Sequence, residues 1–384
     1  MLGTSIGHLT AVAGVDSVLK VRPVPGAVER CQERLRLSIE HEVEAGRTKE
    51  DYLAACLARL LVSSDYSALA DCEIVLECVP EKMAVKRRVL SEAEEMLGPG
   101  QVLASSTSAL SIGALAVGLA RPECFVGMHY FWPAHRRRLV EIAPHAATDG
   151  STLRLAHRLA RVQDIQVLPV TDSPGFLTTR SIFAFFSEAI RVAEQGVPIE
   201  EIDCALKAFG WPMGAFHLMD LLTFETLAEV YDSMIPVMGE RGEGIRVLRK
   251  LIRAGHGGRR YGSGFYLYDG DREGPNPAAK ALFPKGDRLP TCPDEWALRP
   301  THMMIHEAAH CLAEGVVAAW QDVELGATIG LAFPTRHGGG MLGYLREIGW
   351  ETFVGTLVDW EGRYGERFRP YWKDTVQPPA LGSL

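Results

Sequence analysis

The amino-acid sequence predicts an α/β domain built on a mostly parallel sheet, followed by two related all-α domains. Short apolar runs alternate with helical patterns as far as residue 172, as strands and helices do in a parallel sheet. A long apolar helical run then covers residues 176–195, and part of its pattern recurs after residue 299. Because 384 residues are too many for one typical core, two or three domains are expected.

The composition narrows the class of protein. Hydrophobic residues make up 47% and charged residues 23%, which is ordinary for a globular protein. The net charge of -8 argues against a nucleic-acid-binding protein and means that an anionic substrate would need a local basic patch. The eight cysteines are scattered without a C-x-x-C pair, as expected in a reducing compartment. The sequence shows neither a membrane-spanning apolar stretch nor a signal-peptide pattern, so a cytoplasmic protein is expected.

The first thirty residues are typical of part of a dinucleotide-binding βαβ unit. Residues 2–10 have the pattern of its helix, and residues 18–21 that of the following strand. A strand and a G-x-G-x-x-G turn precede this helix in such units, and here the sequence starts at what would be the last glycine, Gly3. We therefore expect residues 1–172 to form a Rossmann-like domain that lacks its first strand. Two explanations are open: the start lies inside a longer reading frame, or the chain is a decayed paralogue.

The remaining elements of this domain follow in order. Residues 26–62 mix charged and apolar side chains at helical spacing, with a break at Gly46. Short apolar runs predict strands at 73–79, 102–106, 124–128 and 166–169. The domain is expected to end at Asp172, before the long helical run.

Residues 102–141 contain the best candidates for chemistry. A hydroxyl cluster, Ser105 to Ser108, follows one apolar run, and His129 follows the next. Glu141 comes twelve positions later. A histidine, a carboxylate and a hydroxyl at strand ends are the parts needed for a general base, its orienting partner and a polar anchor. A histidine after an apolar run is also common as a purely structural residue, so the pattern alone leaves that alternative open.

Three segments of this stretch carry a resemblance to a known family. They are ASSTSALSI at 104–112, GMHYFWP at 127–133 and LVEI at 139–142. They resemble the 3-hydroxyacyl-CoA dehydrogenase family, above all the dehydrogenase half of the multifunctional fatty-acid oxidation enzymes. Similar segments continue along the chain, with DSPGF at 172–176, KAFGWPMGAF at 207–216 and GSGFY at 262–266. The resemblance therefore covers nearly the whole chain.

The resemblance implies an enzyme of fatty-acid β-oxidation that oxidises a 3-hydroxyacyl-CoA to a 3-oxoacyl-CoA with NAD. It implies that His129 is the general base, that Glu141 holds the other ring nitrogen, and that Ser108 hydrogen-bonds the substrate oxygen. The family carries a catalytic asparagine where this chain has Thr179. Threonine keeps a hydrogen-bonding hydroxyl but loses the reach and the second polar group of the amide.

The resemblance also assigns residues to the cofactor. Gly3 belongs to the pyrophosphate-binding turn, and Ser106 stands at a further asparagine position of the family. Glu81 and Lys86 match positions that contact the nicotinamide half, with a charged first helical turn as the alternative. The acidic residue that would bind the adenosine ribose is missing, and Arg22 stands near that place. Because an arginine suits a 2′-phosphate, NAD is expected and NADP stays an alternative.

An acyl-CoA substrate follows from the resemblance, which also allows a hydratase or thiolase partner and a homodimer. The rival hypothesis is an acyl-CoA-binding or assembly subunit of a β-oxidation complex with impaired catalysis. The intact histidine, glutamate and serine favour the enzyme. The lost glycines, the lost acid and the replacement of three asparagines, by Ser106, Trp132 and Thr179, favour the rival.

Residues 173–384 are expected to form two related helical domains. They cover 173–270 and 299–384, and a linker rich in proline, glycine and charge joins them at 271–298. The relation rests on a repeat, in which Glu-Ala and Gly-Val pairs at 188–189 and 196–197 recur at 307–308 and 315–316.

The segment from His306 to His310 reads H-E-x-x-H, which on a helix is a zinc-binding pattern. It is the second copy of residues 187–191, where neither histidine has a counterpart. We therefore expect no metal.

Overall fold

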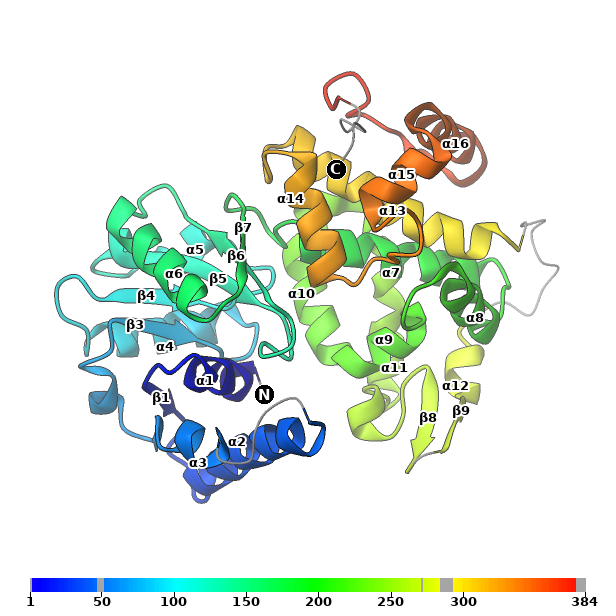
Figure 1. Cartoon of the computed structure of the whole chain (residues 1–384). Helices are drawn as coiled ribbons and strands as arrows, with labels where there is room; N and C mark the ends of the chain where they lie inside the picture. Colours follow the sequence, from blue (N-terminus) through cyan, green and yellow to red (C-terminus); the bar gives the residue numbers. More distant parts are fainter. Residues whose placement is uncertain (1, 47–51, 271, 284–292, 378–384) are drawn as a thin grey trace. The chain divides into compact units, whose positions relative to one another are not determined.

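The computed structural model describes residues 2–46, 52–270, 272–283 and 293–377. The chain divides into two units, Met1–Asp172 and Ser173–Leu384, and each is considered by itself (Figure 1). Within the described ranges, every helix is too short or too polar to cross a lipid bilayer.

The first unit is built on a five-stranded sheet with the order β3-β4-β5-β6-β7. Its strands are β3 (Ile74–Glu77), β4 (Val102–Ser105), β5 (Phe125–Tyr130), β6 (Leu139–Ala143) and β7 (Gln166–Pro169). β3, β4 and β5 run parallel, whereas β6 is antiparallel to β5 and parallel to β7. Every residue of β4, β5 and β6 is buried, as expected for central strands that helices cover on both faces.

A second, separate sheet contains β1 (Ser17–Lys20) and β2 (Leu60–Ser63), which pair in parallel. The helix α1 (Leu2–Val12) packs on both sheets. Its Gly7 lies against Leu19, where an added Cβ would come within 3.0 Å of that side chain, and its Ile6 is buried in the core of the larger sheet. β1 and β3 each have one edge without a partner strand among the described residues, as expected for a Rossmann-like unit that lacks its first strand.

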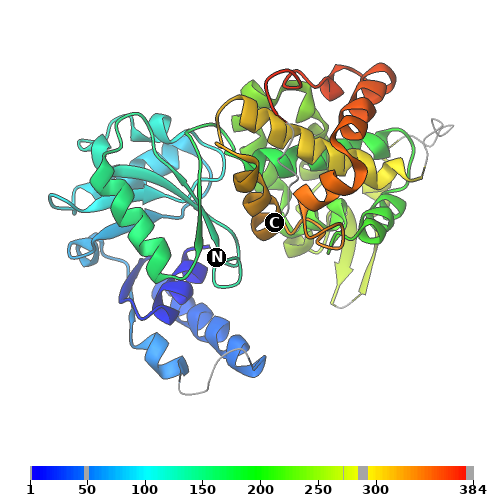
Figure 2. The ribbon, with the colours of Figure 1, turned by 45° about the horizontal axis from the view of Figure 1, so that its top comes forward.

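Helices cover both faces of the larger sheet. α1 and α6 (Gly150–Val162) lie on one face, and Figure 2 shows α6 as the teal-green helix that crosses it. α4 (Met83–Glu94) and α5 (Ile112–Ala116) lie on the other face, since Gly127 alternates with the α1-facing Met128 and meets Ile112. α2 (Ala27–Glu44) and α3 (Tyr52–Leu57) complete the unit beside the small sheet.

The second unit is mainly helical, and its two longest described helices are α7 (Thr178–Glu194) and α13 (Glu295–Ala313), which pack against each other (Figure 1). A small antiparallel sheet in this unit consists of β8 (Tyr266–Asp269) and β9 (Arg272–Pro275). The other helices are α8 (Ile199–Phe209), α9 (Ala215–Leu222), α10 (Phe224–Met238), α11 (Val247–Arg253), α12 (Pro277–Lys280), α14 (Trp320–Leu325), α15 (Met341–Ile348) and α16 (Trp350–Tyr364).

Reciprocal ion pairs join α7 and α13. Arg180 of α7 contacts Glu307 of α13 at 2.6 Å, and Arg299 of α13 donates to Glu188 of α7 with its Nε at 2.9 Å. In each helix the glutamate stands eight positions after the arginine. All four side chains are at least 99% buried. The two glutamates of the predicted repeat therefore occupy equivalent places in an approximately two-fold, antiparallel helix pair.

β6 and β8 were not among the predicted strands, and two predicted segments have a different structure. Residues 60–62 were expected to be helical, but they belong to β2, because the apolar run Leu60–Ser63 pairs with β1. The predicted linker at 271–298 contains β9, α12 and the start of α13. Asn276 accepts a hydrogen bond from the backbone of Ala278 and so caps α12, with Pro277 at the first helical position.

The Glu188→Ala variant tests the reciprocal pairs. It leaves Arg299 and Arg367 buried without their carboxylate partner. Removing one member of a buried ion pair typically costs about 3–5 kcal/mol, so we expect the free energy of unfolding of the second unit to fall by that amount. Urea unfolding followed by tryptophan fluorescence measures it, since Trp132 is the single tryptophan outside this unit.

The matched control is Glu366→Ala, which removes one of the two carboxylate partners of the exposed Arg369 in the same unit. Exposed ion pairs contribute little to stability, so its unfolding midpoint should stay at the wild-type value. Equal shifts of the unfolding midpoint in the two variants would show that burial does not determine how much the pairs between α7 and α13 contribute to stability.

Candidate active site

The candidate site lies at one edge of the larger sheet in the first unit. β4 and β5 are parallel, with Ser105 level with Gly127, so the chain beyond both strands emerges at the same edge. The loop after β4 carries Ser106 and Ser108, and His129 is the second-last residue of β5. The fold therefore brings the predicted hydroxyls and the predicted base to one side of the sheet.

His129 and Glu141 form a buried pair. They stand directly opposite each other in the antiparallel ladder of β5 and β6, so their side chains share one face of the sheet. His129 Nδ1 and Glu141 Oε2 are 2.6 Å apart, and Glu141 has no exposed surface. Because the carboxylate can only accept, Nδ1 carries the proton in the neutral ring and Nε2 is the basic nitrogen.

Two features hold the backbone around this pair. A Cβ at Gly127 would lie 2.6 Å from Ile112 Cδ1, so glycine allows α5 to approach β5 closely. Asp172 accepts hydrogen bonds from the backbone N–H groups of Ile112 and Gly113, at 2.7 and 2.8 Å, and from the Ser111 hydroxyl. This carboxylate caps α5 and ties the end of the first unit to the loop after β4.

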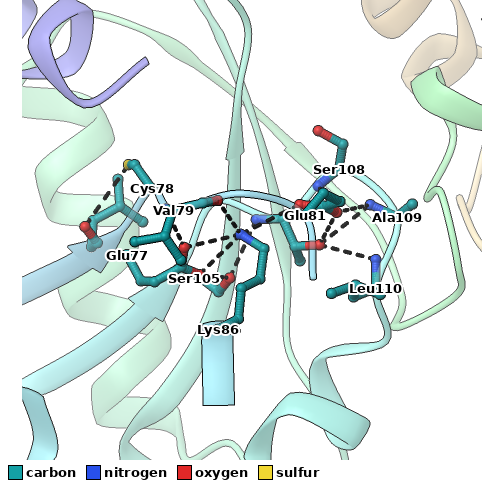
Figure 3. A network of polar contacts seen from close by, with 11 residues as sticks. Glu77, Cys78, Val79, Glu81, Lys86, Ser105, Ser108, Ala109 and Leu110 are labelled. Atoms are coloured by element: carbon teal, nitrogen blue, oxygen red, sulfur yellow. Dashed lines mark hydrogen bonds and ion pairs between the residues drawn. The ribbon is translucent and has the colours of Figure 1, made fainter. Parts of the chain in front are cut away.

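The hydroxyls at this edge differ in their surroundings. The Ser106 hydroxyl is buried beside the Cys78 thiol and has no nitrogen or oxygen partner in the described part of the chain. Ser108 is partly exposed, and Figure 3 shows its hydroxyl directed away from the neighbouring polar network. A buried hydroxyl with only a thiol beside it is poorly satisfied unless a ligand binds it, so this edge fits the polar end of a bound cofactor.

Glu81 and Lys86 belong to a buried polar network (Figure 3). Lys86 Nζ lies 3.0 Å from Glu77 Oε1, 3.3 Å from Glu81 Oε2 and 3.2 Å from the carbonyl oxygen of Val79. Burial lowers the pKa of Lys86, but Glu81 and Glu77 outweigh burial and the pKa lies above its ordinary value. The three acceptors match the three protons of the ammonium group. Lys86 therefore neutralises and joins groups within the protein. Its expected contact with the cofactor stays a prediction.

The other predicted site residues lie in different places. Gly3 is in the first turn of α1, where an added Cβ would be 3.6 Å from the Cβ of Cys78. Arg22 is exposed just beyond β1. Thr179 is 7% exposed in the first turn of α7, which belongs to the second unit. The roles assigned to these three residues stay predictions.

The sequence interpretation assigned no individual role to three residues that shape the site: Glu77, Thr107 and Asp172. Glu77 ends β3 and accepts a hydrogen bond from Ser105 at 2.7 Å. Thr107 is fully buried, and its hydroxyl donates to Glu81. A carboxylate inside an otherwise apolar strand was the one available signal, because such a group is rarely buried without a partner.

The H-E-x-x-H segment is part of α13 and is committed to packing. Glu307 binds Arg180 and Arg241, and His306 Nδ1 accepts a hydrogen bond from Trp372 Nε1 at 3.0 Å. Burial holds the pKa of His306 well below its ordinary value and lowers that of His310 to about 3. Among the described residues, no group of three or more histidine, cysteine or acidic side chains could hold a metal ion.

Comparisons with known proteins agree with this architecture. Residues 1–173 match the family described as 3-hydroxyacyl-CoA dehydrogenase, NAD binding domain, and residues 175–268 match its C-terminal domain. The fatty acid oxidation complex subunit alpha of Vibrio cholerae is 30% identical over 375 residues, which are 96% of this chain and 52% of that protein.

Solved structures show the same likeness. The 3-hydroxybutyryl-CoA dehydrogenase of Escherichia coli has a TM-score of 0.80 at 23% identity, covering 96% of this chain and 94% of that one, which shows a shared fold. FadB2 of M. tuberculosis has a TM-score of 0.66 at 30% identity, covering 69% of this chain and 95% of that one.

The first unit is thus an NAD-binding domain of the Rossmann-like class, followed by a helical C-terminal region. The chain belongs to the 3-hydroxyacyl-CoA dehydrogenase family. It spans about half the length of the curated relatives it matches, from 44% to 52% of those proteins.

Purified protein is expected to contain no stoichiometric zinc, because Trp372 uses one nitrogen of His306 and two arginines use Glu307. Elemental analysis by mass spectrometry measures the metal content, with His157→Ala, an exposed histidine of α6, as the control. One zinc per chain that disappears in His306→Ala but persists in His157→Ala would overturn this expectation.

Proposed function

We propose that this chain catalyses the reversible, NAD-dependent oxidation of a 3-hydroxyacyl-CoA to a 3-oxoacyl-CoA. One observation carries the proposal: a histidine paired at 2.6 Å with a fully buried glutamate, at the polar edge of the sheet in an NAD-binding domain of this family. Burying a carboxylate costs free energy, so a fully buried one is expected to have a catalytic or structural role.

His129 is the proposed general base. Nε2 takes the proton of the substrate's C3 hydroxyl as the C3–O bond becomes a carbonyl. Glu141 keeps the Nδ1–H tautomer before this step and stabilises the imidazolium after it, and its burial strengthens that attraction. In the reverse direction the imidazolium returns the proton to the forming hydroxyl. Ser108 donates a hydrogen bond to the C3 oxygen, and this bond holds the substrate oxygen beside His129.

The proposed cofactor site uses residues of the same unit. The first turn of α1, with Gly3, provides helix N–H groups that favour the pyrophosphate, and Ser106 offers its buried hydroxyl, which has no nitrogen or oxygen partner among the described residues, to the nicotinamide end. When bound, NAD supplies the acceptor for the hydride that leaves C3.

The relatives support a setting for this reaction. The relatives from Shewanella frigidimarina and Vibrio cholerae are named as alpha subunits of fatty acid oxidation complexes, so we propose that the chain works in β-oxidation beside a hydratase or thiolase. We also propose the cytoplasm as its location, in keeping with the scattered free cysteines. Pairing with a second copy of the chain stays a prediction.

The His129→Gln variant tests the proposed base. General-base contributions are typically about 10²–10⁴-fold, so kcat for acetoacetyl-CoA reduction, followed at the NADH absorbance, should fall by that factor. Glu141→Gln should lie between wild type and His129→Gln, because the imidazole remains but its stabilising charge is lost. The control is the exposed His157→Gln, which should keep wild-type turnover. Wild-type turnover in His129→Gln would favour the acyl-CoA-binding subunit instead.

Thr179→Asn tests the departure from the family's catalytic asparagine. We expect it to raise kcat in the same assay, because it restores the amide that threonine lacks. Thr178→Asn, one position earlier in the same helix, is the control and should not raise kcat. A Thr179→Asn variant with lower or unchanged activity would show that this position does not act on the substrate oxygen.

A further inference from the structure

The loop that carries Ser108 is anchored to one carboxylate oxygen. Glu81 Oε1 accepts hydrogen bonds from the backbone N–H groups of Ser108 and Ala109, both at 2.9 Å, and from the Thr107 hydroxyl. Thr107 Oγ1 in turn accepts from the N–H of Leu110 at 2.9 Å. Residues 107–110 are therefore bound to Glu81, three of them directly and Leu110 through the Thr107 hydroxyl. Glu81 follows β3, whereas these four residues follow β4.

The charge of Glu81 is maintained by its surroundings. Burial raises the pKa of Glu81, but Lys86 and the hydrogen bonds from residues 107–109 outweigh burial, so the pKa lies below its ordinary value. Lys86 is itself held by Glu77, and Glu77 by the Ser105 hydroxyl. The network thus links β3, α4 and β4 to the loop. An ionised carboxylate binds N–H groups about twice as strongly as a neutral oxygen does.

The geometry leaves one side chain of the loop available. Thr107 and Ala109 are buried, whereas Ser108 between them is partly exposed. Figure 3 shows the Ser108 hydroxyl on the side opposite to Glu81. Fixing the N–H groups of residues 108 and 109 fixes the backbone torsions of Ser108, and with them the direction of its Cα–Cβ bond. Only rotation about that bond remains.

We infer that Glu81 is a positioning residue for Ser108: its carboxylate fixes the loop so that the serine hydroxyl meets the substrate oxygen. The inference rests on the proposed dehydrogenase function. It departs from the assignment of Glu81 to the cofactor, because the carboxylate reaches the substrate through the loop. Reaction rates are sensitive to displacements of about 1 Å in such a group, so a loosened loop should lower kcat more than it raises KM.

A double-mutant cycle tests the inference. Glu81→Gln and Ser108→Ala are each expected to lower kcat for acetoacetyl-CoA reduction about 10–100-fold, with KM changed about twofold or less. If Glu81 acts through Ser108, the double variant should have the kcat of Ser108→Ala within about threefold, because residues that act as a unit are not additive. The control is Glu92→Gln, a half-buried glutamate on α4 that accepts a hydrogen bond from Tyr66, which should keep wild-type kcat.

The outcomes separate the possible failures. Multiplying effects in the double variant, or a loss of kcat in Glu81→Gln that Ser108→Ala does not share, overturn the positioning role. If Glu81→Gln does not fold, Thr107→Val replaces it, since this change removes one donor to the carboxylate at nearly constant volume. Its smaller loss, about threefold to tenfold, should also vanish in the Ser108→Ala background. Failure of the proposed function is distinct, because His129→Gln would then leave the activity of the same preparation unchanged.

Discussion

A single constraint recurs in both units: a carboxylate that leaves water must have a cation or several donors around it. In the first unit Glu141 has His129, and Glu77 and Glu81 share Lys86. In the second unit the glutamates of α7 and α13 have arginines. Each requirement joins segments that are far apart in the sequence, so the buried carboxylates decide which elements must be adjacent. The candidate site is one of these meeting points, where the partner of the carboxylate is a histidine.

Much of the fold follows from patterns that are local in sequence. Apolar runs of four to seven residues located β3, β4, β5 and β7, and the long apolar stretch located α7. The errors have a common physical origin. Leu60–Ser63 is a strand only because β1 lies beside it, and β9 is a strand only because β8 does. Pairing between distant segments overrides the local preference, and one sequence does not reveal that pairing.

The candidate site was predictable as a set of residues but not as an arrangement. Resemblance supplied His129, Glu141 and Ser108, and the register of β5 against β6 shows why the first two meet. The sequence offered only a charged first helical turn as the alternative for Glu81, whereas Glu81 precedes α4. Its hydrogen bonds with residues 107–109 depend on how two strand ends are placed in space. A backbone N–H group can donate a hydrogen bond whatever side chain its residue carries. The identities of residues 108 and 109 therefore do not reveal these contacts, and sequence reasoning could not find them.

The contact that the reciprocal ion pairs make between α7 and α13 does not depend on protein concentration. Two separate proteins that met through such an interface would come apart once their concentration fell below the dissociation constant. Here both helices belong to one chain, so their meeting is intramolecular, with an effective concentration set by the chain segment 195–294 between them. That value does not change with the amount of protein present. The α7 face is therefore covered equally well in a dilute assay and in a crowded cell.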